Sequence, residues 1–367
     1  MKAESKPNYS KTMYDIIPSF ITAFLITFFA IPSIIKIAIE KNLCDEPGER
    51  RSHSHSIPTL GGIGIFAGLI FSITFWIPFN SCSNPDYEYV KYILCAYIII
   101  FLIGAKDDII PLPPIKKFVG QLLAAFILVY KARISLSSLY GIFGIDDIQP
   151  WVSIPLTVLT IIVIINAFNL IDGINGLAGT IGVITCSVFG LWFYLFGRLD
   201  LAIISAATNG ALIAFLCYNM SNPARIFMGD TGSLLVGLTA SILAISFIEN
   251  NKVWHSAWSI QSVPAVAIGI LIIPLFDTLR VFVIRVLRKK SPFHPDRTHV
   301  HHLLLDTGLT HLQSTAILAL VNLAFIFMSY FLMKIGTLNL LVLNFSLAAS
   351  LTGFLFYLVH LKKNKKS

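Results

Sequence analysis

Residues 166–179 read NAFNLIDGINGLAG and lie between two long apolar runs, residues 151–165 and 180–196. One carboxylate and three amides recur here at every third position, a spacing that places side chains near one face of a helix. Polar side chains at the end of a membrane helix are costly unless they serve a function. Helix capping would explain one of them more easily than four in register. The stretch therefore predicts two membrane helices joined by a functional segment. Its four polar residues are Asn166, Asn169, Asp172 and Asn175.

The composition is that of a membrane protein. The chain has 367 residues, of which 56% are hydrophobic and only 13% charged, and its mean hydropathy is +0.77. Soluble domains carry about 25% charged residues. Apolar runs long enough to span a bilayer recur along the chain, and they are too continuous for the strands of a barrel. We therefore expect an all-α polytopic membrane protein, with residues 1–367 as a single domain.

Eleven transmembrane helices are expected from the apolar runs. An odd number places the termini on opposite sides of the membrane. Lysine and arginine gather on the side of the C-terminus, which the positive-inside rule assigns to the cytoplasm, so the N-terminus is expected outside. The first run is too long for a signal-peptide core and is expected to be retained. The predicted helices cover residues 14–39, 61–79, 89–105, 115–131, 151–169, 177–197, 200–220, 232–249, 263–288, 312–334 and 339–361.

The charge distribution argues against nucleic-acid binding, and the cysteine spacing argues against a disulfide-stabilised fold. The formal net charge is +8, but the basic residues occupy helix ends and loops and form no aromatic-interleaved basic domain, so nucleic acid is not an expected partner. The five cysteines are scattered and show neither CxxC spacing nor a disulfide framework. Chemistry is therefore sought in the polar loops, most of which this orientation brings to the cytoplasmic face.

Asp107 and Asp108 form an adjacent acidic pair at the end of a predicted helix. Neighbouring carboxylates repel each other unless a cation or strong donors lie nearby, although a solvated loop would also accommodate them. A second acidic position, Asp230, lies in NPARIFMGDTGS at residues 222–233 between two glycines. The next helix begins there, and its free N–H groups could hold phosphate oxygens. A simple helix-capping aspartate is the alternative.

A histidine-rich loop follows at residues 295–302, PDRTHVHH, and contains Arg297, His299, His301 and His302. These side chains suit a phosphate-rich ligand, while zinc stays an alternative that lacks an accompanying cysteine. The first cytoplasmic loop, RRSHSHSIPTLGG at residues 50–62, is either a positive membrane anchor or a holder of lipid phosphate, with His53 as a candidate substrate contact.

Together these loops offer carboxylates, a helix start and a cationic segment on one face of the membrane. Magnesium suits such a site because it takes a few carboxylates and completes its shell with phosphate oxygens and water. The reaction class implied is phosphoryl transfer on a pyrophosphate, with one partner held in the bilayer.

Five blocks in this order resemble the polyprenyl-phosphate N-acetylhexosamine-1-phosphate transferases of bacterial membranes, glycosyltransferase family 4. They lie within residues 50–311. The helix number and the H-x-H-H spacing resemble the undecaprenyl-phosphate GlcNAc-1-phosphate transferase branch. The blocks are LGGIGIF at 60–66, GAKDD at 104–108, NAFNLIDGINGLAG at 166–179, NPARIFMGDTGS at 222–233 and PDRTHVHHLLL at 295–305.

The resemblance implies an enzyme that transfers N-acetylglucosamine-1-phosphate from UDP-GlcNAc to undecaprenyl phosphate and releases UMP. Asp107 and Asp108 match the pair that positions or deprotonates the lipid phosphate, and Asp172 lies in the catalytic pocket. Asp230 and Asn169 match Mg²⁺-binding positions, where Mn²⁺ is a possible substitute. The resemblance also implies two groups of substrate contacts, one near the uracil and one at the donor's diphosphate or sugar. The contacts near the uracil are Asn175 and Phe227. The contacts at the diphosphate or sugar are His299, His301 and His302.

The resemblance also implies the setting of the reaction. We expect a bacterial inner-membrane enzyme with a cytoplasmic active site, with undecaprenyl phosphate, a UDP-sugar and membrane lipid as partners and a homodimer as an open option. Another UDP-N-acetylhexosamine or UDP-MurNAc-pentapeptide is the alternative donor, and a lipid-linked substrate transporter is the alternative of another class. Asn175 departs from the Asp of many bacterial members, and Thr59 from the basic residue that often precedes LGG.

Overall fold

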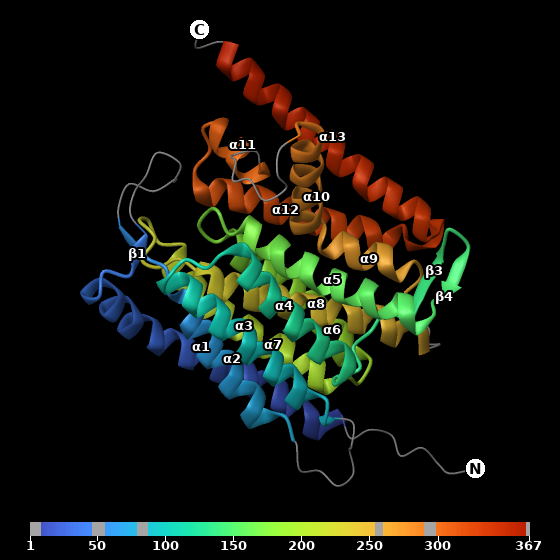
Figure 1. The fold of residues 1–367 in the computed structure, drawn as a ribbon, viewed down its shortest axis with the longest axis horizontal. Coiled ribbons are helices and arrows are strands. Elements are labelled where there is room, and N and C mark those ends of the chain that lie inside the picture. The colour runs from blue at the N-terminus through green and yellow to red at the C-terminus, as the bar shows by residue number, and fades with distance from the viewer. Residues whose placement is uncertain (1–8, 46–55, 79–86, 254–259, 290–298, 365–367) are drawn as a thin grey trace.

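The computed structural model describes residues 9–45, 56–78, 87–253, 260–289 and 299–364, and most of them are helical (Figure 1). Each of the eleven predicted ranges contains a helix. The helices are α1 Tyr9–Glu40, α2 Gly61–Trp76, α3 Val90–Ile109, α4 Pro114–Tyr130, α5 Pro150–Ile171, α6 Leu177–Leu195, α7 Leu199–Asn219, α8 Gly229–Val253, α9 Val263–Ile270, α10 Ile272–Leu287, α11 Val300–Asp306, α12 His311–Phe331 and α13 Thr337–Asn364.

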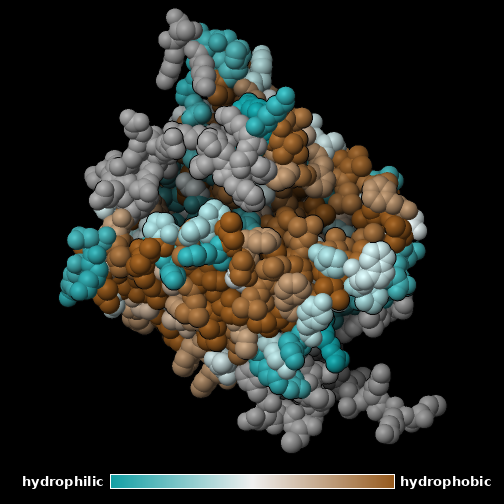
Figure 2. Space-filling view, in the orientation of Figure 1, coloured by the Kyte–Doolittle hydropathy of each residue, from teal (hydrophilic) through white to brown (hydrophobic). Residues whose placement is uncertain are grey.

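The helices confirm a polytopic membrane protein. Within the described residues seven of them are long and apolar enough to cross a membrane, or eight if the bent pair α9 and α10 is one span. Figure 2 shows a broad hydrophobic band between hydrophilic groups at the edges of the molecule, as expected for a surface that faces lipid. Eleven crossings and the orientation of the termini stay predictions.

Helix α8 lies inside the bundle and packs against α2, α3, α5 and α6. Its apolar window is 94% buried. Small residues allow the neighbours to approach closely, as is usual between membrane helices. A Cβ on Gly237 would lie 2.6 Å from the Cα of Ile165, and the hydroxyls of Tyr97 and Thr239 are 2.8 Å apart. The bundle therefore fixes α8 firmly, including the end that carries Asp230.

The segment 263–288 is not one continuous helix, so that prediction is wrong. It divides into α9 and α10, which meet at 85°. Pro274 explains the break because it has no amide hydrogen to donate to the Ile270 carbonyl four residues earlier. That carbonyl accepts instead from Nδ2 of Asn322 in α12, at 3.2 Å. The break directs α10 to a place where it contacts α5, α12 and α13.

Two short hairpins depart from a purely helical fold. Strands β1 (Cys44–Asp45) and β2 (Ile57–Pro58) pair antiparallel and close the first loop. Strands β3 (Ser138–Ile142) and β4 (Ile145–Asp147) form the second hairpin, beside the start of α13 in Figure 1. There Oγ1 of Thr337 donates to the Tyr140 carbonyl at 3.1 Å.

Candidate active site

The first turn of α8 is packed against the backbones of α2 and α3. The amide of Gly62 donates to the Met228 carbonyl at 2.9 Å. A Cβ on Gly104 would lie only 2.5 Å from the Cα of Thr231, so a side chain at this position would hold the two helices apart. These glycines bring the acidic end of α3 against the start of α8.

Asp108 caps α8 from another helix. Its Oδ1 accepts from the Asp230 amide at 2.7 Å, and its Oδ2 accepts from the amide and the hydroxyl of Thr231 at 3.0 and 2.5 Å. The negative carboxylate also favours the positive end of the helix dipole. The prediction that free N–H groups here hold phosphate is therefore wrong for these two amides, which already have a partner.

Asp107 and Asp230 share the ammonium group of Lys117, in the first turn of α4. Nζ of Lys117 lies 2.5 Å from Oδ2 of Asp107 and 2.6 Å from Oδ2 of Asp230. Oδ1 of Asp107 accepts from the Leu112 amide at 2.6 Å, which fixes the loop between α3 and α4. Asp107 and Asp108 thus have different surroundings, although they are adjacent in sequence. The sequence does not single out Lys117, because its partners come from two other helices, α3 and α8.

The amide of Asn169 completes this cluster. Its Nδ2 donates to Oδ1 of Asp230 at 3.1 Å and to Oγ of Ser233 at 2.9 Å. Asn169 and Asp230, the two residues expected to bind Mg²⁺, are thus in direct contact, and their metal-binding role stays a prediction. Asn166, the first polar residue of the motif, does not join this cluster. Its Nδ2 donates to Oε1 of Gln121 in α4 at 2.7 Å, a contact that suits a structural role.

The residues of this cluster fit a bound Mg²⁺. Two carboxylates converge on one cation, the Lys117 ammonium, so the position favours positive charge. Asn169 lies beside Asp230, and rotation of its amide would turn an oxygen toward a metal. Among the described residues no group of three or more His, Cys, Asp or Glu side chains is arranged to hold a metal. A site with few protein ligands suits Mg²⁺, because phosphate oxygens and water complete its shell.

Asp172 lies immediately after α5. Burial raises the pKa of its carboxyl well above the ordinary value, and the charges of Asp230 and Asp108 raise it further. The three carboxyl groups therefore lie close enough to influence one another.

The loop between α5 and α6 is held by its backbone. The amide of Gly176, which has φ +80°, donates to Oδ1 of Asn219 at 2.6 Å. The Asn175 carbonyl accepts from Oγ1 of Thr315 at 2.8 Å, and its amide donates to Nδ1 of His311 at 3.4 Å. Helices α7 and α12 thus fix the position of Asn175.

Phe227 is joined to the end of the first loop. Its amide donates to the Pro58 carbonyl at 2.7 Å, and its carbonyl accepts from the Gly61 amide at 3.0 Å. The described end of the first loop is therefore bonded to the segment before α8 through Pro58 and Gly61. His53 and Arg297 lie outside the described residues.

The histidine segment is anchored to α10 by Asp277, a residue that the sequence analysis did not single out. Its buried carboxylate accepts from the Val300 amide at 3.0 Å and from Nη2 of Arg280 at 2.8 Å. Nδ1 of His299 lies 2.8 Å from its other oxygen. Asp277 is the one acidic residue in the apolar range 263–288, and this isolated charge could have indicated a functional position. Nδ1 of His299 is therefore paired with Asp277, which leaves Nε2 as the ring nitrogen that could contact a ligand.

His301 links this segment to the loop after α5. Its Nε2 lies so close to Gly173 that a Cβ there would overlap it. Burial, and after it the neighbouring His302, together lower the pKa of His301 to about 3, although Asp277 acts in the opposite direction. His301 is therefore neutral near pH 7, so it could contact a ligand by hydrogen bonding and not by charge. The rings of His301 and His302 have centroids 4.3 Å apart.

Gly62→Ala tests the packing at α8. The added methyl group would overlap the backbone nitrogen of Gly232, so we expect a loss of roughly 1–3 kcal/mol of stability and a lower thermal midpoint. Gly353→Ala in α13 is the control, because nothing lies within 4 Å of its Cβ position. Thermal unfolding in one detergent measures both variants, and equal midpoints would contradict the close approach.

Asp277→Asn tests the anchor of the histidine segment. An amide in place of the carboxylate loses the charged partner of His299 and Arg280, and misplacement of a binding group by about 1 Å can cost a hundredfold in rate. We expect a loss of that order in transfer rate. Asp306→Asn, an exposed change on α11, should stay within about twofold. An unchanged rate in Asp277→Asn would remove the positioning role.

The chain is similar in sequence to known proteins. Residues 90–248 match the family described as Glycosyl transferase family 4. The chain is 32% identical over 312 residues to undecaprenyl-phosphate alpha-N-acetylglucosaminyl 1-phosphate transferase of Salmonella typhi, covering 82% of this chain and 79% of that protein. It is 31% identical over 318 residues to the probable undecaprenyl-phosphate N-acetylglucosaminyl 1-phosphate transferase of Bacillus subtilis, with 85% and 84% covered. The Escherichia coli K12 relative, which bears the same name as the Salmonella protein, is 31% identical over 314 residues, with 83% and 80% covered.

The chain therefore belongs to glycosyl transferase family 4, a class of membrane-bound transferases. Within that family it falls in the undecaprenyl-phosphate N-acetylglucosamine-1-phosphate transferase branch.

Proposed function

We propose that the protein transfers N-acetylglucosamine-1-phosphate from UDP-GlcNAc to undecaprenyl phosphate. An oxygen of the lipid phosphate attacks the sugar-linked phosphorus of the donor, and the bond from that phosphorus to the oxygen shared with the uridine-linked phosphate breaks. The products are UMP and a lipid-linked diphosphate sugar. The observation that supports this best is the convergence of Asp107, Lys117, Asn169 and Asp230 at the start of α8.

Lys117 and Asp107 have complementary roles in this proposal. The ammonium lies between two carboxylates and can shift toward phosphate oxygens as a substrate enters, because it is a compact charge on a flexible stem. A phosphate monoester has a second pKa of about 6, so the acceptor is already largely dianionic at neutral pH. Asp107 therefore orients the acceptor and needs little basicity.

Asp108 acts through α8 in this proposal. Its carboxylate holds the first turn of that helix, so Asp230 faces the cluster in a fixed position. Asp230 and Asn169 would hold Mg²⁺, which when bound neutralises charge on the diphosphate. Asp172 would donate a hydrogen bond to an oxygen of the UDP-sugar when its carboxyl group carries a proton. Phe227 and Asn175 would contact the uracil, and His301 and His302 the diphosphate or sugar.

The membrane setting follows from the charge pattern. We propose eleven crossings with the N-terminus outside and the C-terminus in the cytoplasm of a bacterial cell. The cluster lies where α3, α5 and α8 end or begin, so it faces the cytoplasm in this orientation. The enzyme could act either as a monomer or as a homodimer.

A donor panel tests the substrate. Purified protein in nanodiscs receives undecaprenyl phosphate and Mg²⁺ with UDP-GlcNAc, UDP-GalNAc or UDP-MurNAc-pentapeptide, and released UMP is measured. The expected result is release with UDP-GlcNAc that depends on the lipid and stops with chelator. A preference for another donor would correct the sugar, and no release from any donor would reject the transferase proposal.

A further inference from the structure

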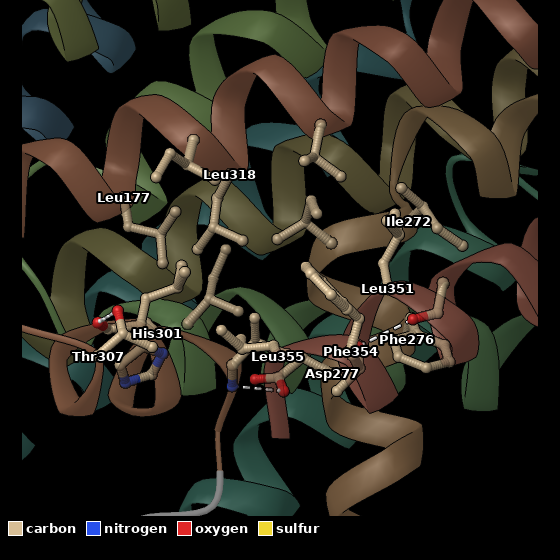
Figure 3. Close-up of a pocket in the computed structure, with 18 of the residues that line it drawn as sticks. Leu177, Ile272, Phe276, Asp277, His301, Thr307, Leu318, Leu351, Phe354 and Leu355 are labelled. Carbon is tan, nitrogen blue, oxygen red and sulfur yellow. Dashed lines mark hydrogen bonds between the residues drawn. The ribbon is translucent and has the colours of Figure 1, made fainter. Parts of the chain in front are cut away.

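A large, mostly apolar cavity, drawn in Figure 3, is lined by residues that do not include Asp230 or its partners Asp107 and Lys117. Its volume is about 530 Å³, and its walls come chiefly from α10, α12 and α13. Ile272, Leu318 and Leu355 form part of the lining. Phe354, another lining residue, is 60% exposed. The α13 wall of the cavity is therefore partly exposed, on a helix whose exposed side chains are mostly apolar.

Lys362 is the one lysine in a lining that is mostly apolar and whose other polar members are Asp277, His301, Thr307 and Thr352. Lys362, near the end of α13, contributes to the wall, and its Nζ donates to the Thr307 carbonyl at 2.6 Å. An ammonium group has three donors, so this bond leaves it able to bind an anion. Three more lysines follow in the sequence, at positions 363, 365 and 366. Clusters of lysine next to a membrane helix attract anionic lipid headgroups.

The position and size of the cavity select its occupant. None of its lining residues is Asp107, Lys117 or Asp230, so a phosphate held by Lys362 would not lie at the catalytic cluster. Cavities of about 300–1,000 Å³ hold ligands of the size of a drug molecule. This cavity is thus suited to a single acyl chain and is too small for a whole polyprenyl chain.

We propose that this cavity binds one acyl chain of an anionic phospholipid, whose phosphate pairs with Lys362. The chain would fill the apolar space between α10, α12 and α13, which otherwise leaves side chains without packing partners. His301 and Asp277 also line the cavity, with His301 beside Thr307 in Figure 3, so a bound lipid would contact the histidine segment as well.

Lipid retention tests this proposal without any enzyme assay. Protein is taken from nanodiscs that contain equal phosphatidylglycerol and phosphatidylcholine, and bound lipid is counted by native mass spectrometry. Leu351→Trp fills the cavity and should lower retained phosphatidylglycerol about tenfold. Lys362→Gln should lower it about fivefold, since one lysine near anionic lipid contributes that much.

Two matched variants serve as controls. Leu347→Trp lies one turn earlier on α13 and does not line the cavity, and Lys334→Gln is exposed beyond the far end of α12. Both should retain wild-type amounts. Wild-type retention in Leu351→Trp, or equal retention of both phospholipids by the wild type, would overturn the proposal. Displacement of phosphatidylglycerol by added undecaprenyl phosphate would overturn it too, in favour of the acceptor. Failure here leaves the proposed transferase activity untouched, because retention is measured without donor.

Discussion

Lys117→Met is expected to lower the rate of UMP release by about 100- to 1,000-fold, the usual cost of losing one charged donor in an active site. Methionine keeps the length and the apolar stem of lysine but removes the ammonium that Asp107 and Asp230 share. Two carboxylates then face each other without their cation, which raises the pKa of at least one. The substrate phosphate would also lose a positive group.

The control for this prediction is its neighbour. Lys116→Met changes an exposed lysine of the same helix turn and should leave the rate within about twofold, as expected for a solvated charge. Both variants are purified, checked for equal thermal midpoints and assayed under saturating Mg²⁺. A loss of less than threefold in Lys117→Met would mean that the cluster is only structural.

Asp107→Asn and Asp108→Asn should separate activity from stability, although the two residues are adjacent. Asp108 accepts three hydrogen bonds from the first turn of α8, and an asparagine would turn an NH₂ group toward one of those donors. We expect a loss of roughly 2–3 kcal/mol, because hydrogen bonds to a charged group are strong, and a loss of activity with it. Asp107→Asn keeps an acceptor for the Leu112 amide, so its thermal midpoint should change little while its activity falls.

Thermal unfolding and UMP release, measured on the same preparations, check this separation. Asp146→Asn in the β3–β4 hairpin is exposed and should change neither quantity. Equal midpoints for Asp107→Asn and Asp108→Asn would contradict the capping role of Asp108. Full activity in Asp107→Asn would remove it from the reaction.

Helix positions could be predicted from the sequence because lipid leaves few choices for an apolar run. The eleven ranges all contain helices. The family resemblance assigned Asn169 and Asp230 to the same metal site, and their side chains are in contact. The break at Pro274 was missed because a long apolar run outweighed one proline. Its cost is offset by Asn322, 48 positions further along the chain, which no local pattern indicates.

The site was less predictable because its contacts cross between helices. Lys117 looks like any lysine at a membrane surface until α3 and α8 place two carboxylates beside it. In the sequence Asp108 cannot be distinguished from its neighbour Asp107. The structure separates them, because only Asp108 accepts hydrogen bonds from Thr231. Asp277 was hidden inside an apolar helix. Residue types and spacing indicated phosphate chemistry, whereas individual roles depended on packing between helices.

The fate of one phosphorus atom tests the central claim most directly. UDP-GlcNAc labelled with ³²P in the phosphate attached to the sugar is incubated with the protein, Mg²⁺ and undecaprenyl phosphate, and the lipid is extracted. The account predicts that the label enters the lipid fraction while the UMP released in equal amount carries none. Label that stays in water-soluble UDP, with unlabelled sugar on the lipid, would show transfer of the sugar alone and would contradict the account.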